Sequence, residues 1–307
     1  MATTIPRIEV ESIPCNVCGV DQAEELYAAN IDSPTDRDGW MSCTDDRLGQ
    51  HGRIVRCRAC GLVYTNPRYR CDAIVDAYEA VQDPTYVAES QARIKTFAKS
   101  LDLIERYHPQ RGRLLDVGCY TGVFLQVARS RGWKVQGLEP SQWACALAQA
   151  QGMTVHQGTL TTAPWSAPCF DVITLWDVLE HLTDPLGDLQ RVHALLVPNG
   201  HVALTTINIG SLPARLLGTR WWWLMEMHLY YFSRGTLTRM LEKAGFQVVG
   251  IHQHVRMISV GYLWTRLEPY LRGGARALAW CGERLRLNQW HIPVTLGDLI
   301  TVIAKKR

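Results

Sequence analysis

The stretch Arg113-Leu-Leu-Asp-Val-Gly-Cys-Tyr-Thr-Gly122 decides the fold of this chain. An apolar run carries an acid near its end, a loop with two glycines follows, and Val123–Arg131 continues with apolar residues at helical spacing. The pattern predicts a strand, a tight turn and a helix that stops at Gly132. Glycines let the backbone approach a ligand closely, and a helix N-terminus offers unpaired N–H groups and a positive dipole end. We therefore expect a ligand-binding loop here.

The spacing of the loop separates two kinds of nucleotide site. In the dinucleotide fingerprint, glycines would also stand where this chain has Tyr120 and Val123, so that fingerprint fails. The remaining pattern, with Asp116, Gly118 and Gly122, resembles the first motif of class I S-adenosylmethionine-dependent methyltransferases, Asp-x-Gly-x-Gly-x-Gly. The resemblance implies that Asp116 and this loop, Tyr120 included, hold the methionine end of the cofactor. Tyr120 replaces a glycine that the family usually has, and a non-catalytic relative is the alternative.

Strands and helices alternate from residue 113 onward, which predicts a parallel sheet. The second strand, Lys134–Glu139, ends in a carboxylate that can accept hydrogen bonds from both ribose hydroxyls of a nucleoside, and Pro140 follows it. A third strand spans Thr154–Gly158. Family members often place an acid for the adenine amine directly after it, where this chain has Thr159 and Leu160.

The fourth predicted strand, Phe170–Asp177, runs into Asp-Val-Leu-Glu-His-Leu-Thr-Asp-Pro185, a second and more specific resemblance to these methyltransferases. Its carboxyl end lies at the topological switch point, where ligands bind in open sheets. Trp176 and Asp177 are therefore candidate cofactor contacts. His181 is the first candidate general base, because imidazole titrates near neutrality; a purely structural role is the alternative.

The aromatic stretch Trp221–Ser233 contains His228, the second candidate base. Its tryptophans and tyrosines either wall an acceptor pocket or belong to the core. Strands at His201–Asn208, Phe246–His254 and Asp298–Ala304 complete the seven-stranded, Rossmann-like sheet that the resemblance implies.

Two Cys-x-x-Cys-Gly sequences in the N-terminal region predict a metal site. Two residues between cysteines let both thiolates face one point, and four thiolates suit structural Zn²⁺. The alternatives are iron in the same cage, redox chemistry and disulfides. The predicted ligands are Cys15, Cys18, Cys57 and Cys60.

Residues 1–72 form a zinc-ribbon-like module in this interpretation, as in methyltransferases of sugars and secondary metabolites, which the run Cys60–Arg68 resembles. The module holds eight Lys and Arg against eleven Asp and Glu, and this negative balance argues against a nucleic-acid reader. Residues 73–112 are a predicted helical cap or linker, and 113–307 the methyltransferase domain.

Residues 255–297 read as a helical insertion in that domain, with six arginines, two glutamates and three tryptophans. Basic and aromatic residues together suggest contact with a membrane surface or an anionic carrier; a helical lid or a homodimer contact is the alternative. The chain has 307 residues, a net charge of +3 and 47% apolar residues, which is globular, and it shows no signal or spanning segment. We expect a cytoplasmic protein.

The predicted activity is in-line methyl transfer from S-adenosylmethionine to a small-molecule acceptor: a sugar, a secondary metabolite or a lipid-linked intermediate. Two alternatives remain, an RNA methyltransferase that reads its substrate with the zinc ribbon, and a non-catalytic binding protein with the same fold.

Overall fold

A seven-stranded sheet forms the centre of the computed structural model, which describes residues 9–31, 48–88, 90–261, 263–264, 280, 283–284 and 287–307. In spatial order the strands are β12 (Phe246–Gln253), β15 (Leu299–Lys306), β10 (Leu196–Ile207), β9 (Phe170–Trp176), β6 (Arg113–Val117), β7 (Lys134–Glu139) and β8 (Val155–Gln157). β15 runs antiparallel to both neighbours, and the strands from β10 to β8 are parallel. The order reverses between β6 and β9. The predicted Rossmann-like sheet is confirmed.

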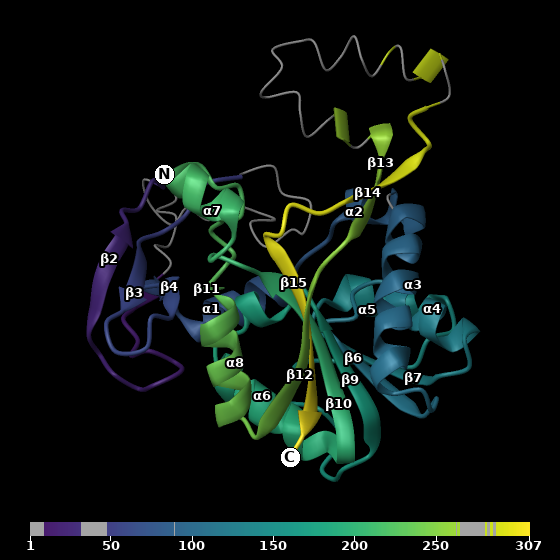
Figure 1. The fold of residues 1–307 in the computed structure, drawn as a ribbon. Helices are drawn as coiled ribbons and strands as arrows, with labels where there is room; N and C mark the ends of the chain where they lie inside the picture. The colour runs from purple at the N-terminus through teal and green to yellow at the C-terminus, as the bar shows by residue number, and fades with distance from the viewer. Residues whose placement is uncertain are drawn as a thin grey trace, which may run out of the picture.

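Helices cover both faces of this sheet (Figure 1). One face carries α3 (Ser90–Tyr107), α4 (Val123–Ser130) and α5 (Gln142–Ala150), and the other carries α6 (Pro185–Leu195) and α8 (Arg234–Lys243). Three of these helices, α5, α6 and α8, begin where side-chain oxygens accept the first free N–H groups. The capping residues are Ser141, Asp184 and Ser233.

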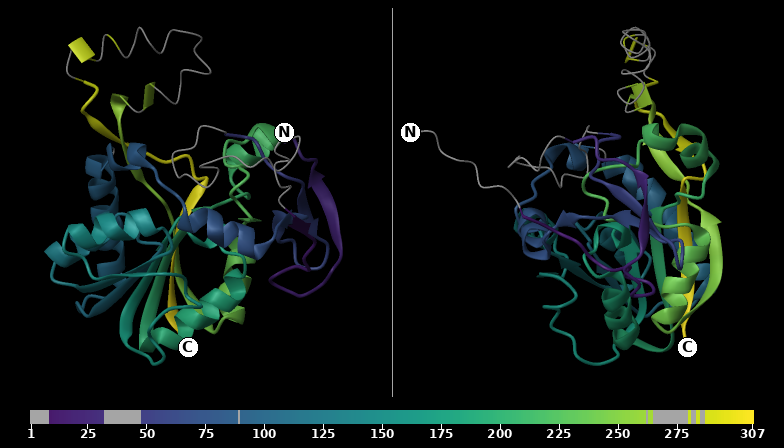
Figure 2. Two further views of the ribbon diagram at one scale, coloured as in Figure 1. Left: turned by 180° about the vertical axis from the view of Figure 1, so that it is seen from behind. Right: turned by 90° about the vertical axis from the view of Figure 1, so that its left-hand side faces the viewer.

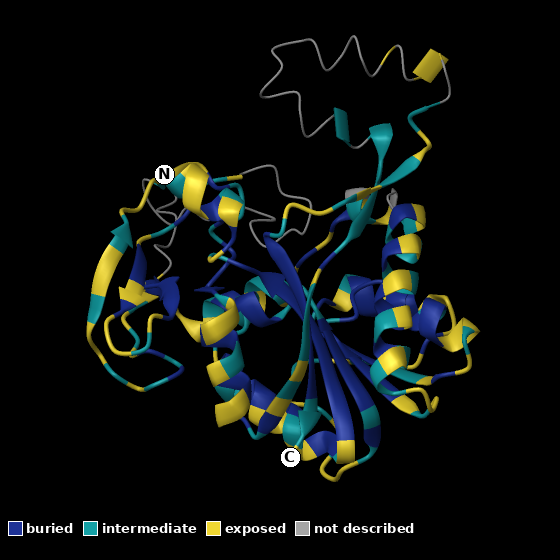
Figure 3. Cartoon of the chain, in the orientation of Figure 1, coloured by how far each residue is buried: buried dark blue, intermediate teal, exposed yellow. Residues whose placement is uncertain are grey.

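Successive residues of a strand point to opposite faces of the sheet and contribute to two separate apolar cores. Leu114 packs with α3 and α4, while Leu115 packs on the opposite side with residues of α6 and α8. Figure 3 shows the central strands buried along most of their length and the helices exposed only on their outer faces. The sheet is therefore a rigid frame, and its strand ends fix the loops that follow them.

The N-terminal module is joined to the methyltransferase domain by backbone pairing. Its sheet contains β2 (Ala23–Tyr27), β3 (Ile54–Cys57), β4 (Val63–Thr65) and β11 (Tyr230–Tyr231). β11 comes from the aromatic stretch far along the chain and pairs antiparallel with β4. A two-stranded ladder joins β1 (Val10–Glu11) to β5 (Arg68–Tyr69), and α1 (Cys71–Glu79) and α2 (Pro84–Ala88) lead into α3. Figure 2 shows these N-terminal strands, in purple, from two further sides.

The remaining described elements are η1 (Leu179–His181), α7 (Leu212–Leu217), η2 (Gly218–Arg220), β13 (Arg256–Ser259) and β14 (His291–Val294). β13 and β14 form an antiparallel ladder at the two ends of the predicted 255–297 insertion. Residues 262, 265–279, 281–282 and 285–286 of that insertion lie outside the described residues. Among the described helices, none combines the length and apolar character needed to cross a bilayer.

Candidate functional site

The loop after β6 has a backbone that favours glycine. Gly118, Tyr120 and Gly122 have φ of +68°, +48° and +77°, in the left-handed region. A Cβ on Gly118 would lie 2.6 Å from Cγ2 of Val178. Tyr120 is a residue with a side chain in this strained region, and such strain clusters at ligand sites. The loop thus leads, as predicted, into the N-terminus of α4 at Gly122.

Two buried carboxyl groups lie beside this loop. Asp116 accepts a hydrogen bond of 2.6 Å from Thr174 Oγ1. Glu139, at the end of β7, accepts from the backbone N–H groups of Tyr120 at 2.7 Å and Ser141 at 2.9 Å. Burial raises the pKa of Asp116 to about 8 and that of Glu139 to about 7, and the charge of Glu139 also raises that of Asp116. Glu139 therefore ties the loop to the start of α5.

The segment between α1 and α2 packs over the ends of these strands. The Val81 carbonyl accepts a hydrogen bond of 2.8 Å from Ser141 Oγ. The ring of Tyr86 meets that of Tyr120 edge-on at 4.4 Å between centroids, and the Trp143 ring lies 6.0 Å away on α5. These rings cover the loop and can stack on a planar ligand.

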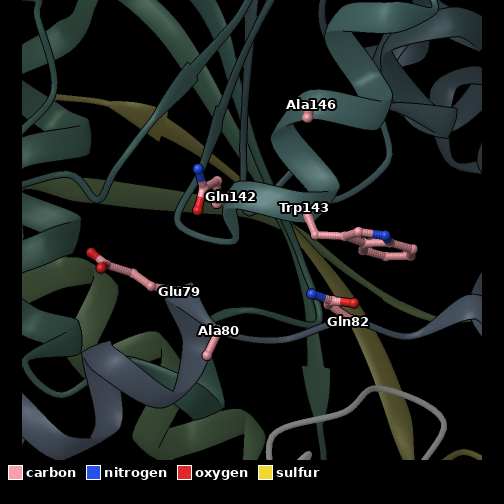
Figure 4. Close-up of a pocket in the computed structure, with 6 residues that line it drawn as sticks. All are labelled: Glu79, Ala80, Gln82, Gln142, Trp143 and Ala146. Carbon is pink, nitrogen blue, oxygen red and sulfur yellow. The ribbon is translucent and has the colours of Figure 1, made fainter.

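A cavity of about 280 Å³ opens next to this aromatic cluster (Figure 4). The end of α1 borders it on one side and the first turn of α5 on the other, and Trp143 separates it from Tyr120. Its lining residues are Glu79, Ala80, Gln82, Gln142, Trp143 and Ala146.

Four further predicted cofactor residues occupy the neighbouring strand ends. Pro140 is half-buried after β7. After β8, Thr159 bonds within its own turn to Thr161 Oγ1 at 2.7 Å, and Leu160 is buried. Trp176 ends β9 with its ring against Phe124 of α4, at 5.1 Å between centroids. All of them lie on the same edge of the sheet as the loop after β6.

Asp177, the residue directly after β9, carries two marks of a functional position. Its φ is +54°, and its Oδ1 is buried without a hydrogen-bond partner in the described part of the chain. Its Oδ2 accepts a hydrogen bond of 2.5 Å from Arg256 Nη2. Strain and an unsatisfied buried oxygen are costly, and they persist mainly where a ligand uses them.

The two candidate histidines lie together next to Asp177. The rings of His181 and His228 are 4.8 Å apart between centroids, and ligand atoms of both lie within 4.8 Å of one of Glu180. Thr206 Oγ1 donates to Glu180 Oε2 at 2.8 Å. Burial lowers the pKa of His181 to about 4 and that of His228 to about 3, so both are neutral at pH 7. Burial, together with the Asp177 charge, raises the pKa of Glu180.

Sequence reasoning missed three members of this polar group. His254 follows β12, Arg256 is the first residue of β13, and Thr206 lies at the end of β10. Burial lowers the pKa of His254, the charge of Asp177 opposes this shift, and His254 Nδ1 contacts Thr301 Oγ1 at 2.9 Å. No local motif marks these residues, because only the folded sheet sets the ends of β10 and β12 near the end of β9.

The aromatic stretch divides into core and site. Trp221, Tyr230 and Tyr231 are fully buried, which makes them core residues. Trp223 is partly exposed, lies 6.2 Å from the His228 ring between centroids, and has the guanidinium of Arg256 over its ring at 5.1 Å. This part of the stretch borders the polar group.

The four predicted metal ligands converge in the N-terminal module. Cys15 Sγ lies 3.4 Å from Cys60 Sγ, and Cys18 Sγ lies 3.5 Å from Cys57 Sγ. All four sulfurs lie within 4.8 Å of one another, and none is in a disulfide. The glycine after each Cys-x-x-Cys pair has positive φ, and its N–H donates to the carbonyl of the first cysteine. Tetrahedral Zn–S bonds of about 2.3 Å set sulfurs about 3.8 Å apart, so the cage fits this ion.

Comparisons with known proteins agree with this geometry. A family model described as a methyltransferase domain matches residues 88–251, more than half of the chain. The ubiquinone biosynthesis O-methyltransferase of Haemophilus ducreyi is 36% identical over 107 residues, covering 31% of this chain and 45% of that protein. The enzyme of the same name from Aeromonas salmonicida is 30% identical over 157 residues, covering 46% and 66%. The chain thus spans about half the length of the curated relatives it matches.

Among solved structures, a SAM-dependent methyltransferase of Thermotoga maritima has a TM-score of 0.49 at 18% identity, covering 71% of this chain and 91% of that one. The YcgJ protein of Bacillus subtilis has a TM-score of 0.46 at 19% identity, covering 68% and 98%. With the strand order, the glycine loop and the family match in place, the chain belongs to the class I S-adenosylmethionine-dependent methyltransferases.

Proposed function

We propose that this protein transfers the methyl group of S-adenosylmethionine to a hydroxyl group of a small-molecule acceptor. One observation carries the proposal. The buried carboxyl of Glu139 and a polar group at Asp177 lie on the same sheet edge, on either side of β6, where the strand order reverses. The O-methyltransferase names of the relatives support an oxygen acceptor.

The cofactor side follows from the loop and its carboxyls. Glu139 would accept hydrogen bonds from the two ribose hydroxyls. The loop from Asp116 to Gly122 would hold the methionine end of the cofactor near the N-terminus of α4. The ring of Tyr86 and the Val81 carbonyl cover this edge and exclude water. Alignment of the methyl group with the acceptor is worth roughly 7–11 kcal/mol of the barrier, so positioning is the main task of these residues.

The acceptor side is the group around His181 and His228. The Nδ1 of each contacts a backbone carbonyl, Met227 O at 3.0 Å and Trp223 O at 2.7 Å. A carbonyl only accepts, so each Nδ1 carries the proton and each Nε2 keeps its lone pair. Either Nε2 is placed to take the acceptor's proton, and the lowered pKa of both rings makes them weak bases for this step.

The RNA alternative receives little support from the module's charges. Most of the arginines near the second cysteine pair have acidic partners within the module, so they offer phosphate little free charge. These ion pairs are Arg53–Glu25, Arg58–Glu24, Arg68–Glu11 and Arg70 with Glu9 and Asp72.

We also propose that the four cysteines hold a structural Zn²⁺, supported by their convergence. The membrane-surface, anionic-carrier or homodimer contact predicted for 255–297 stays a prediction, since residues 262, 265–279, 281–282 and 285–286 of that segment lie outside the described residues.

The test is formation of S-adenosylhomocysteine, measured by mass spectrometry with catechols, nucleotide sugars and total RNA as acceptors. We expect turnover with a hydroxylated small molecule and none with RNA. Cofactor binding is measured separately by calorimetry. No S-adenosylmethionine binding at millimolar concentration would overturn the proposal, and turnover on RNA alone would replace it.

A further inference from the structure

The cluster of Glu180, His181 and His228 has the composition of a metal site. One carboxylate and two imidazoles offer ligand atoms within 4.8 Å of one another. This is the donor set of catalytic zinc sites with two histidines and a glutamate, and of two-histidine, one-carboxylate iron sites. Tetrahedral bonds of about 2.0–2.1 Å would set ligand atoms about 3.3 Å apart, so small side-chain rotations bring the three onto one ion.

Each member of the cluster is already oriented by a second hydrogen bond. His181 and His228 donate Nδ1–H to the carbonyls of Met227 and Trp223, which points both Nε2 lone pairs away from those carbonyls. Thr206 Oγ1 holds one oxygen of Glu180. Metal-binding histidines almost always donate their other ring N–H in this way, and ligating carboxylates are hydrogen-bonded too. The Glu180 and His228 side chains are almost fully buried, which favours a fixed geometry.

The net charge around the cluster favours binding of a cation. Glu180 and Asp177 are two carboxyl groups of this site, and Arg256 is the cation paired with Asp177. With both carboxyls ionised the group carries about one excess negative charge, and Asp177 Oδ1 is buried without a hydrogen bond in the described chain. A divalent ion reverses that excess, and an anionic oxygen bound to it brings the group to neutrality.

We propose that Glu180, His181 and His228 bind a divalent transition-metal ion that receives the acceptor hydroxyl. This role rests on the proposed methyl transfer and refines it, because the Nε2 atoms then serve as ligands rather than as bases. Three protein ligands leave coordination positions open. The acceptor oxygen binds there and loses its proton to water. Its bond to the methyl carbon forms as the S–CH₃ bond breaks, and S-adenosylhomocysteine leaves.

The experiment counts metal ions in the full chain. Zinc-loaded protein is dialysed and analysed by mass spectrometry, and we expect about two ions per chain, one in the cysteine cage and one here. His228→Asn keeps a side-chain N–H close to the position of Nδ1 but removes Nε2, so it should retain about one ion without unfolding. His201→Asn, a change at a buried histidine of β10 outside the polar group, should retain about two.

A spectrum assigns the second ion. A mild chelator first removes the second zinc ion. Co²⁺ then added should give visible bands without thiolate charge transfer, and His228→Asn and Glu180→Gln should each remove them. A single ion in wild-type protein, or a second ion that survives both substitutions, would overturn the metal site. Methyl transfer that persists in metal-depleted protein would overturn its role. An intact second ion without any methyl transfer would instead count against the proposed function alone.

Discussion

At the scale of single residues, Glu139 is the sharpest test of the cofactor site. Glu139→Gln leaves one acceptor oxygen for the N–H groups of Tyr120 and Ser141 and for the ribose hydroxyls. Hydrogen bonds to a charged group are worth about 1.5–3 kcal/mol, so we expect S-adenosylmethionine to bind roughly 10- to 100-fold more weakly by calorimetry. Glu242→Gln, on the exposed face of α8, is the matched control and should bind normally. If both variants bound S-adenosylmethionine with equal affinity, Glu139 would not be a cofactor contact.

The same carboxyl predicts a pH dependence. Its pKa is raised to about 7 in the folded protein, so between pH 4.5 and 7 the folded state keeps a proton that the unfolded chain has lost. This group therefore lowers the stability of the free protein as pH rises through that window. Cofactor affinity has the opposite sign, because the ribose hydroxyls need the ionised carboxylate. We expect affinity to fall about tenfold per pH unit below 7, with proton release detected in buffers of different ionisation enthalpy. In Glu139→Gln this dependence should flatten.

Many residues of the candidate site could be predicted from short stretches of sequence. The acid at the end of β7, the loop after β6 and the two histidines could each be predicted, since each follows a strand or belongs to a motif. Arg256 and Thr206 could not, because their contacts with Asp177 and Glu180 depend on where distant strands end. All the cofactor contacts, those of Thr159 and Leu160 included, remain predictions.

At the scale of elements, the pairing of β4 with β11 links the cysteine module to the acceptor side. Thr65 Oγ1 donates to the His228 carbonyl at 3.0 Å, and Thr65 N donates to the Leu229 carbonyl at 2.9 Å. A two-residue strand inside an aromatic run carries no alternation of its own, which is why the sequence did not predict β11. The long strands of the central sheet, by contrast, were predicted to within a few residues from their apolar runs and flanking glycines.

Thr65→Val tests this link. Valine keeps the shape of the buried threonine but leaves the His228 carbonyl without its donor, which costs about 1–3 kcal/mol of unfolding free energy. Thr65→Ser keeps the hydroxyl and should cost less. Urea unfolding measures stability, and turnover with a fixed acceptor measures the displacement of His228. If serine reduces both quantities and valine reduces neither, the lost methyl group is responsible and the hydrogen bond is not.

At the scale of the whole molecule, two halves meet at β9. The cofactor half, formed by β6 to β8 with α3 to α5, makes few contacts with the module. The acceptor half is bound to it repeatedly: Asn16 Nδ2 donates to Asp184 Oδ1 at 2.8 Å, Arg239 to the Cys60 carbonyl at 2.8 Å and Lys243 to the Val17 carbonyl at 2.6 Å. The sequence predicted the module and its ligands from spacing, but these contacts come from helix surfaces that no pattern marks.

This asymmetry predicts that loss of the module's metal separates acceptor turnover from cofactor binding. Cys60→Ser removes one thiolate from a cage of the kind that contributes roughly 10–16 kcal/mol of apparent folding energy, so the module should lose its ion and release β11. We expect faster amide exchange at Tyr230 and Tyr231 and loss of turnover, while S-adenosylmethionine affinity stays within about threefold, because Asp116 and Glu139 touch no part of the cage. Cys71→Ser, at an exposed cysteine outside the cage, should change none of these. Cofactor affinity that falls together with turnover in Cys60→Ser would show that the two halves fold as one unit.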